Sequence, residues 1–279
     1  MKLSNNAIKF LMSHYRAIYK NAWVKGLATA ALLTAGLTAG QAANAATPLS
    51  DLSTATGDIT ITGSGNDDVA KNEWNSIAVA TGNTIPAPKF NITITGGNTT
   101  ANSIKPDSNN NATLTSTKDL TIASATDKNV GLAIEVANGK TIDASFANVN
   151  VFKGTLTLNA LASGVSGSLF ANTITVGSGS ELADGDASIT LGKNAVLGKD
   201  IAAGNLADLT YVTLNKGGVI QTAAITGSDP LNGTSINAPT LNINGGKLAI
   251  VSKNDGTVGA TIGLNIVKGA MTDGSISVD

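Results

Sequence analysis

The sequence has no cysteine, one histidine (His14) and one arginine (Arg16), and only 4% of its 279 residues are aromatic. Both His14 and Arg16 lie in the first twenty residues. The rest of the chain therefore has no disulfide, no thiolate nucleophile, no Ser-His-Asp triad and no imidazole zinc site. With 18 basic and 19 acidic residues, the chain also lacks the charge excess of a nucleic-acid-binding protein.

Charge and apolar residues are distributed unevenly at the N-terminus. Residues 1–50 contain five basic residues and no acid, and an uncharged, mostly apolar run follows Lys25 and extends over residues 26–40. The small residues Ala43 and Ala45 then precede Ala46. A basic region, a short apolar core and a small-x-small site are typical of a secretory signal peptide, here cleaved after Ala45. The alternative is a membrane anchor, but a membrane span takes about 20 predominantly apolar residues, more than the run over residues 26–40 provides.

The basic region is unusually long and contains Ile18, Tyr19 and Lys20, followed by Trp23. This stretch resembles the extended signal peptide region of type V secretion proteins, the autotransporters and related exoproteins, which carry a similar I-Y-K/R and W pattern. The additional segment 1–17 departs from that pattern. The resemblance implies export through the Sec machinery of a Gram-negative bacterium.

After Ala46, one pattern recurs: Thr or Asn alternates with Ile, Leu or Val, and Gly or Asn follows. Examples are residues 58–63, 91–97, 155–159, 173–177, 188–192, 210–215 and 240–246. Alternation with period two, bounded by Gly and Asn, predicts short, half-buried strands. The corners at Asn215-Lys216-Gly217-Gly218 and Asn244-Gly245-Gly246 suit either a hairpin or a turn between solenoid sides.

The small supply of aromatic side chains decides between two all-β folds. A sandwich must fill a gap of about 10 Å between its sheets, and after residue 45 there are six aromatic residues: Trp74, Phe90, Phe146, Phe152, Phe170 and Tyr211. A narrow interior of stacked Ile, Leu, Val and Ala suits a parallel β-helix, a right-handed β-solenoid after the helical signal segment. We expect outward Thr and Asn to form hydrogen-bonded ladders along the stack. At roughly 22 residues per coil, we expect about ten coils and a rod of order 50 Å.

The segments 212–220 and 240–250, rich in Thr, Asn and Gly, resemble the passenger domains of autotransporters. The predicted organisation is a signal peptide (1–45), N-terminal coils with an exposed Asn/Ser/Thr-rich loop over 98–113 (46–113), and a passenger-like solenoid (114–279). The membrane barrel of a complete autotransporter is missing from this sequence. We therefore expect a fragment truncated at the C-terminus, or else release by another route. A translocator, if it follows, would provide the membrane attachment.

Few residues suggest chemistry. The close acid pairs are Asp67-Asp68 and Asp184-Gly185-Asp186, and hydrolysis by two carboxylates is conceivable. The composition of residues 63–68 favours a solvated turn. The same turn is one imperfect copy of the calcium-binding nonapeptide, whose sites need several tandem copies. Gly139-Lys140-Thr141 lacks the earlier glycine of a phosphate-binding loop. We predict no catalytic residue, no metal and no cofactor.

The predicted function is that of an adhesin-like, non-catalytic passenger at the cell surface, on the outer membrane or outside the cell. Its expected partners are glycans or proteins of a host or neighbouring cell. One alternative is a carbohydrate-active enzyme on the same scaffold. Another is a trimeric autotransporter head, because residues 75–80 and 188–195 look like single head repeats.

Overall fold

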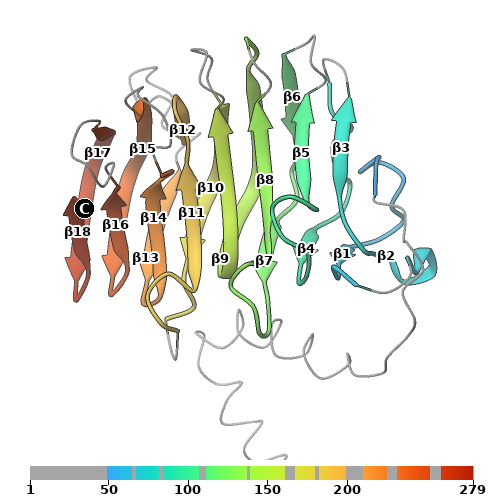
Figure 1. The fold of residues 1–279 in the computed structure, drawn as a ribbon, viewed down its shortest axis with the longest axis horizontal. Helices are drawn as coiled ribbons and strands as arrows, with labels where there is room; N and C mark the ends of the chain where they lie inside the picture. The colour runs from blue at the N-terminus through green and yellow to red at the C-terminus, as the bar shows by residue number, and fades with distance from the viewer. Residues whose placement is uncertain are drawn as a thin grey trace, which may run out of the picture. The chain divides into compact units, whose positions relative to one another are not determined.

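In the computed structural model, strands lie side by side in one stack (Figure 1). They follow the order of the chain, except that residues 73–74 lie beyond residues 59–61. The residues described are 49–64, 67–81, 84–106, 111–136, 139–160, 167–179, 182–198, 210–224, 231–251 and 259–278. The predicted leader, with its cleavage positions Ala43, Ala45 and Ala46 and its motif residues Ile18, Tyr19, Lys20 and Trp23, lies outside these residues.

The described chain is a parallel β-solenoid with three faces, which confirms the predicted fold class. All eighteen strand pairings are parallel. The described residues contain one 3₁₀ turn, η1 (Val69–Lys71), and no α-helix. A face-to-face antiparallel sandwich is thus excluded for this part of the chain.

Four long strands bend across more than one face, and shorter strands occupy one face each. The long strands are β9 (Ile142–Ala160), β10 (Gly167–Val176), β15 (Leu231–Asn244) and β17 (Ala260–Thr272). The first face adds β6 (Ala112–Thr115) and β12 (Ala195–Leu197). The second face adds β1 (Ile59–Ile61), β2 (Glu73–Trp74), β4 (Ile92–Ile94), β7 (Leu120–Ala123) and β13 (Tyr211–Asn215). The third face adds β3 (Ala78–Thr81), β5 (Ser103–Pro106), β8 (Gly131–Val136), β11 (Ala187–Leu191), β14 (Gly218–Thr222), β16 (Lys247–Ile250) and β18 (Ser275–Val278).

Three faces per turn make each coil longer than expected. On the first face, successive turns begin at Ala112, Ile142, Gly167, Ala195 and Thr234, and the fifth closes at Ile262. These five complete turns take 25 to 39 residues each, not the roughly 22 predicted, so the estimate of about ten coils was wrong. The second face has eight stacked levels from Ile59 to Gly269, and β2 adds a ninth beyond β1. Eight levels at about 4.8 Å per level span roughly 34 Å.

The interior consists of aliphatic columns, one side chain per level. On the second face, one column is formed by side chains that are each at most 5% exposed: Ile59, Ile92, Leu120, Val149, Ile174, Val212 and Leu241. The parallel column runs through Ile61, Ile94, Ile122, Val151, Val176, Leu214 and Ile243. The alternating pattern in each strand gives this burial because neighbouring side chains point to opposite sides of a sheet. As expected, aromatic rings contribute little to this core, which contains Trp74 and Phe146.

The two Gly-Gly segments, residues 215–218 and 244–246, are corners of the solenoid and not hairpins. Strands β13 and β14 flank Lys216 and Gly217, but β13 pairs with β10 and β15, whereas β14 pairs with β11 and β16. The long strand β9 turns a corner at Gly154, whose φ is +124°. A Cβ there would lie 2.5 Å from the carbonyl oxygen of Val130 in the adjacent turn, so only glycine fits.

The expected exposed loop over 98–113 is only partly a loop. Residues 98–101 form a turn, but Ser103–Pro106 and Ala112–Thr115 are strands β5 and β6 within the stack. Asn102 is fully buried and Ile104 is a core residue. The segment has a hydrophilic composition because it contains few apolar residues, and the largest of these, Ile104, faces inward.

A hydrogen-bonded ladder of alternating Asp and Asn runs along the corner between the first and second faces. Asn91 Nδ2 donates to Asp58 Oδ2 (3.3 Å), Asn148 Nδ2 donates to Asp119 Oδ1 (2.8 Å), and Thr173 Oγ1 donates to Asn148 Oδ1 (2.6 Å). Asn91 Oδ1 also accepts from the backbone N–H of Asp119 (3.1 Å). The structure therefore contains the predicted polar ladder, and the alternation keeps the carboxylates from facing one another directly.

In the last described turn, inward side chains are covered from one side only. Leu264, Met271 and Ile276 are 41%, 59% and 53% exposed, although the residues above them in the same columns are buried. Each turn of a solenoid is covered by its neighbours, which explains this gradient of burial.

Candidate functional site

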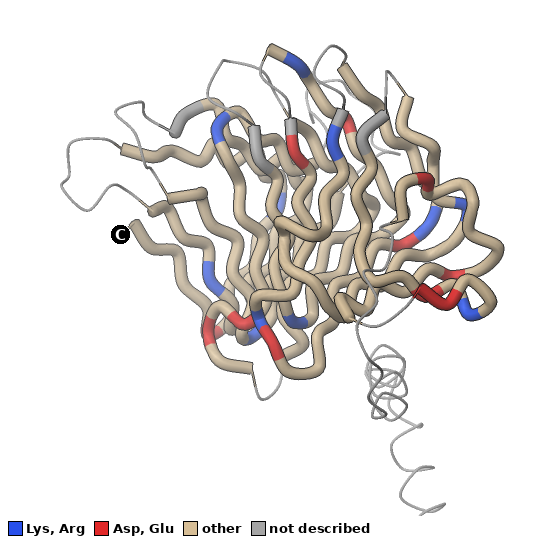
Figure 2. Tube along the Cα trace, turned by 45° about the vertical axis from the view of Figure 1, so that its right-hand side comes forward, with Lys and Arg blue, Asp and Glu red and all other residues tan. Residues whose placement is uncertain are grey.

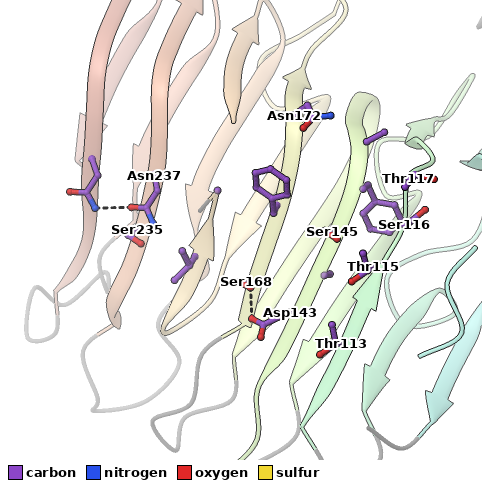
Figure 3. A pocket seen from close by; sticks show the side chains of 17 residues that line it. Thr113, Thr115, Ser116, Thr117, Asp143, Ser145, Ser168, Asn172, Ser235 and Asn237 are labelled. Atoms are coloured by element: carbon purple, nitrogen blue, oxygen red, sulfur yellow. Dashed lines mark hydrogen bonds between the residues drawn. The ribbon is translucent and has the colours of Figure 1, made fainter. Parts of the chain in front are cut away.

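The outer side of the first face carries a groove of about 970 Å³ (Figure 3). It crosses the strands, with Ser235 and Asn237 toward one end and Thr113 and Thr115 toward the other. Most of its lining is hydroxyl and amide side chains: Thr113, Thr115, Ser116, Thr117, Ser145, Ser168, Asn172, Ser235, Asn237 and Asn265. The groove therefore runs along the stack and presents many neutral donors and acceptors.

Strand register brings these residues together from distant parts of the sequence. One outward column contains Thr113, Asp143, Ser168, Val196 and Ser235 at successive levels. The neighbouring column contains Thr115, Ser145, Phe170, Gly198, Asn237 and Asn265, in which Gly198 follows the paired Leu197. Because parallel strands in register align residues about 4.8 Å apart, the two columns form a regular surface, polar except at Val196, Phe170 and Gly198.

Hydrogen bonds join neighbouring turns within the groove. Ser168 Oγ donates to Asp143 Oδ1 (2.5 Å), and Asn265 Nδ2 donates to Asn237 Oδ1 (2.7 Å) (Figure 3). Asp143 is the one acidic residue among the described residues that line the groove, and lysine and arginine do not occur there. The groove therefore carries little charge, and its one carboxylate, that of Asp143, already accepts a hydrogen bond.

Gly198 deepens the groove next to an aromatic ring. Its φ is +86°, and a Cβ there would lie 2.0 Å from the backbone oxygen of Asn237. No side chain can therefore stand between Asn237 and Phe170, which is half-buried in the same column. In this column Phe170 lies between Ser145 and Gly198.

The acid pairs considered in the sequence lie in turns away from the groove. Asp67 Oδ1 accepts a hydrogen bond from the backbone N–H of Asn75 (2.9 Å), and Asp186 Oδ2 accepts one from that of Ala183 (3.3 Å). Asp68 Oδ2 lies 2.8 Å from Lys71 Nζ, and this hydrogen-bonded ion pair lowers the pKa of Asp68 and raises that of Lys71. Asp67, Asp68 and Asp186 thus each have a local structural partner.

Other features of the described chain bear on binding. Its charged residues are sparse and form no continuous stripe of one sign (Figure 2). Within the described ranges, His, Cys, Asp and Glu nowhere gather in groups of three that could hold a metal ion. No helix in the described part of the chain is long and apolar enough to cross a membrane.

Comparison with models of protein families, with curated proteins and with solved structures found no match to this chain. The function is therefore argued from the chain's own residues. Sequence reasoning did not identify the groove or its residues Asp143, Phe170 and Gly198. They become neighbours only through pairing across loops of variable length, a relation that local patterns do not contain.

Proposed function

We propose that the protein is an exported, non-catalytic, adhesin-like β-solenoid that makes contacts through its outer polar faces. The observation that carries this proposal is the groove of the first face, in which hydroxyl and amide side chains extend across five turns. Solenoids commonly use extended surfaces of this kind for binding. Such a surface suits a ligand that is long and touches many turns at once.

The chemistry of the groove favours binding over hydrolysis. Glycoside hydrolysis by acid–base chemistry uses two carboxyl groups about 5–9.5 Å apart. The described residues of the groove supply one, Asp143, and its Oδ1 accepts a hydrogen bond from Ser168. Outside the groove, Asp67 and Asp68 each have a local partner, and Asp186 accepts a hydrogen bond from the backbone of Ala183.

Export is supported by the N-terminal pattern of residues 1–46. When the full chain is produced in a Gram-negative host, we expect exported protein that begins at Ala46, as measured by intact mass and N-terminal sequencing. Replacing both Ala43 and Ala45 with Asp should leave the chain uncleaved, since the signal peptidase accepts small residues at these positions. The matched control is Asn44→Asp, at the position between them, which should be processed normally. Exported protein that keeps residues 1–45 would contradict the proposal.

The adhesin-like role predicts that exported protein binds intact cells. We expect fluorescently labelled protein, purified after export of the full chain, to bind bacterial or host cells saturably, as measured by flow cytometry. Unlabelled protein should compete, and heat-unfolded protein should not bind. Absence of saturable binding to every cell type tested would contradict an adhesin. Loss of polysaccharide chain length during incubation would instead favour the enzyme, and a trimeric mass in solution would favour the trimeric head.

A further inference from the structure

We infer that the groove of the first face binds a neutral, hydroxyl-rich polysaccharide, with one sugar ring against Phe170. This inference rests on the proposed function, because it assigns a ligand class to the same surface. Three features of the groove support it: its charge, its aromatic residue and its direction relative to the strands.

The charge of the groove argues against an acidic ligand. Nucleic acids and polyuronates are bound largely through Lys and Arg, and the described residues lining the groove contain neither. The one charged side chain there, Asp143, would repel a polyanion. Sugar hydroxyls both donate and accept hydrogen bonds, and so do the Ser, Thr and Asn side chains that dominate the lining. A neutral polyol is therefore the best chemical match.

Phe170 provides the apolar contact that a sugar ring needs. It is half-buried in the outward column between Ser145 and the Gly198 position, where a Cβ cannot be accommodated. The negatively polarised face of an aromatic ring attracts weakly positive C–H groups. One face of a pyranose carries several C–H groups, while its hydroxyls project around the edge. Those hydroxyls would then reach Ser145, Ser168 and Asn237.

The direction of the groove favours a polysaccharide over a peptide. An extended peptide usually binds by adding a strand to a sheet edge, through backbone hydrogen bonds. The groove lies across the strands instead. Strands β9, β10, β12 and β15, which form most of it, already pair with the turns on either side, whereas β17, which contributes Asn265, pairs among the described strands with β15 alone. The levels from Thr113 to Asn265 span roughly 24 Å at about 4.8 Å per turn. A linear polymer of several sugars, bound through its own hydroxyls, matches this length and orientation.

The test is affinity electrophoresis of the exported protein in gels that contain a single soluble polysaccharide. The neutral probes are a β-glucan, dextran and mannan, and the anionic probe is polygalacturonate. We expect at least one neutral probe to retard the protein and polygalacturonate not to do so. Phe170→Ala should weaken the retarding affinity about tenfold, as for the loss of one aromatic contact, whereas Phe170→Trp should retain it. The matched control is Tyr211→Ala, because Tyr211 is 48% exposed and does not line the groove.

Each result decides the inference. If no neutral probe retards the protein while labelled protein still binds cells, the polysaccharide assignment is wrong and the adhesin-like function stands. If neither probes nor cells are bound, both fail. Retardation by polygalacturonate alone, or a loss in Tyr211→Ala equal to that in Phe170→Ala, would also overturn the assignment. Circular dichroism of each variant shows whether it is folded, and Phe170→Trp gives a folded test should Phe170→Ala unfold.

Discussion

Ile174→Asp is expected to destroy the cooperative fold, whereas Thr175→Asp, one residue further along the same strand, is expected to leave it intact. Ile174 is completely buried in the column between Val149 and Val212. A carboxylate there would be surrounded by aliphatic side chains, at a cost of several kcal/mol for a buried, unpaired ion. Domains are typically stable by only about 5–15 kcal/mol, so this single change removes much of the total.

Thr175 is the matched control because its side chain points outward. It lies in the half-exposed column between Asn150 and Thr213, where water can solvate a new carboxylate. Surface substitutions of this kind usually change stability by less than about 0.5 kcal/mol. Urea unfolding followed by circular dichroism measures both variants. Equal loss of stability at the two positions would contradict the inward and outward assignment of the second face.

The second large effect is expected from Asn102→Leu, which keeps the number and branching of the side-chain heavy atoms but removes the amide. Asn102 Nδ2 donates to the carbonyl oxygens of Gly96 (2.9 Å) and Gly131 (2.9 Å), and Oδ1 accepts from the backbone N–H of Ile77 (3.2 Å). Ile77, Asn102 and Gly131 belong to three successive turns of the stack. The side chain therefore connects three turns where the chain enters the third face from the turn at residues 98–101.

Leucine at position 102 would leave these three buried backbone groups without their partner. An unsatisfied buried polar group costs about 1–3 kcal/mol, so the free energy of unfolding should fall by at least about 3 kcal/mol. The control is Asn150→Leu on the outward face of β9, which should change stability by less than about 0.5 kcal/mol. Both are measured by urea unfolding. An Asn102→Leu variant as stable as the original chain would show that these groups find other partners.

Several elements of the fold follow from local sequence patterns. The alternation at Ile59-Thr60-Ile61 and Ile174-Thr175-Val176 predicts both a strand and the side that faces the core, because successive side chains point in opposite directions. The scarcity of aromatic residues favours the slim interior of a solenoid over a sandwich. Both predictions are confirmed by the structure.

Other elements could not be predicted in this way. The corner Asn215-Lys216-Gly217-Gly218 has a sequence that suits either a hairpin or a solenoid turn, and only the partners of β13 and β14 distinguish the two. Asn102 looks like a loop residue in a polar segment, yet it is a buried hydrogen-bonding centre. Its role depends on Ile77 and Gly131, which are 25 and 29 residues away in sequence.

The sequence by itself determined the strands with a clear alternating pattern, their inward faces and the absence of a wide aromatic core, since each of these depends on composition or on residues next to one another. Only the tertiary structure decided the number of residues per turn, the strand partners and the groove. Asp143, Phe170 and Asn237 come from three different turns, and their alignment depends on how many residues each intervening loop contains. Loop length costs little free energy and varies freely, so burial of the columns, a property of the whole stack, sets the register.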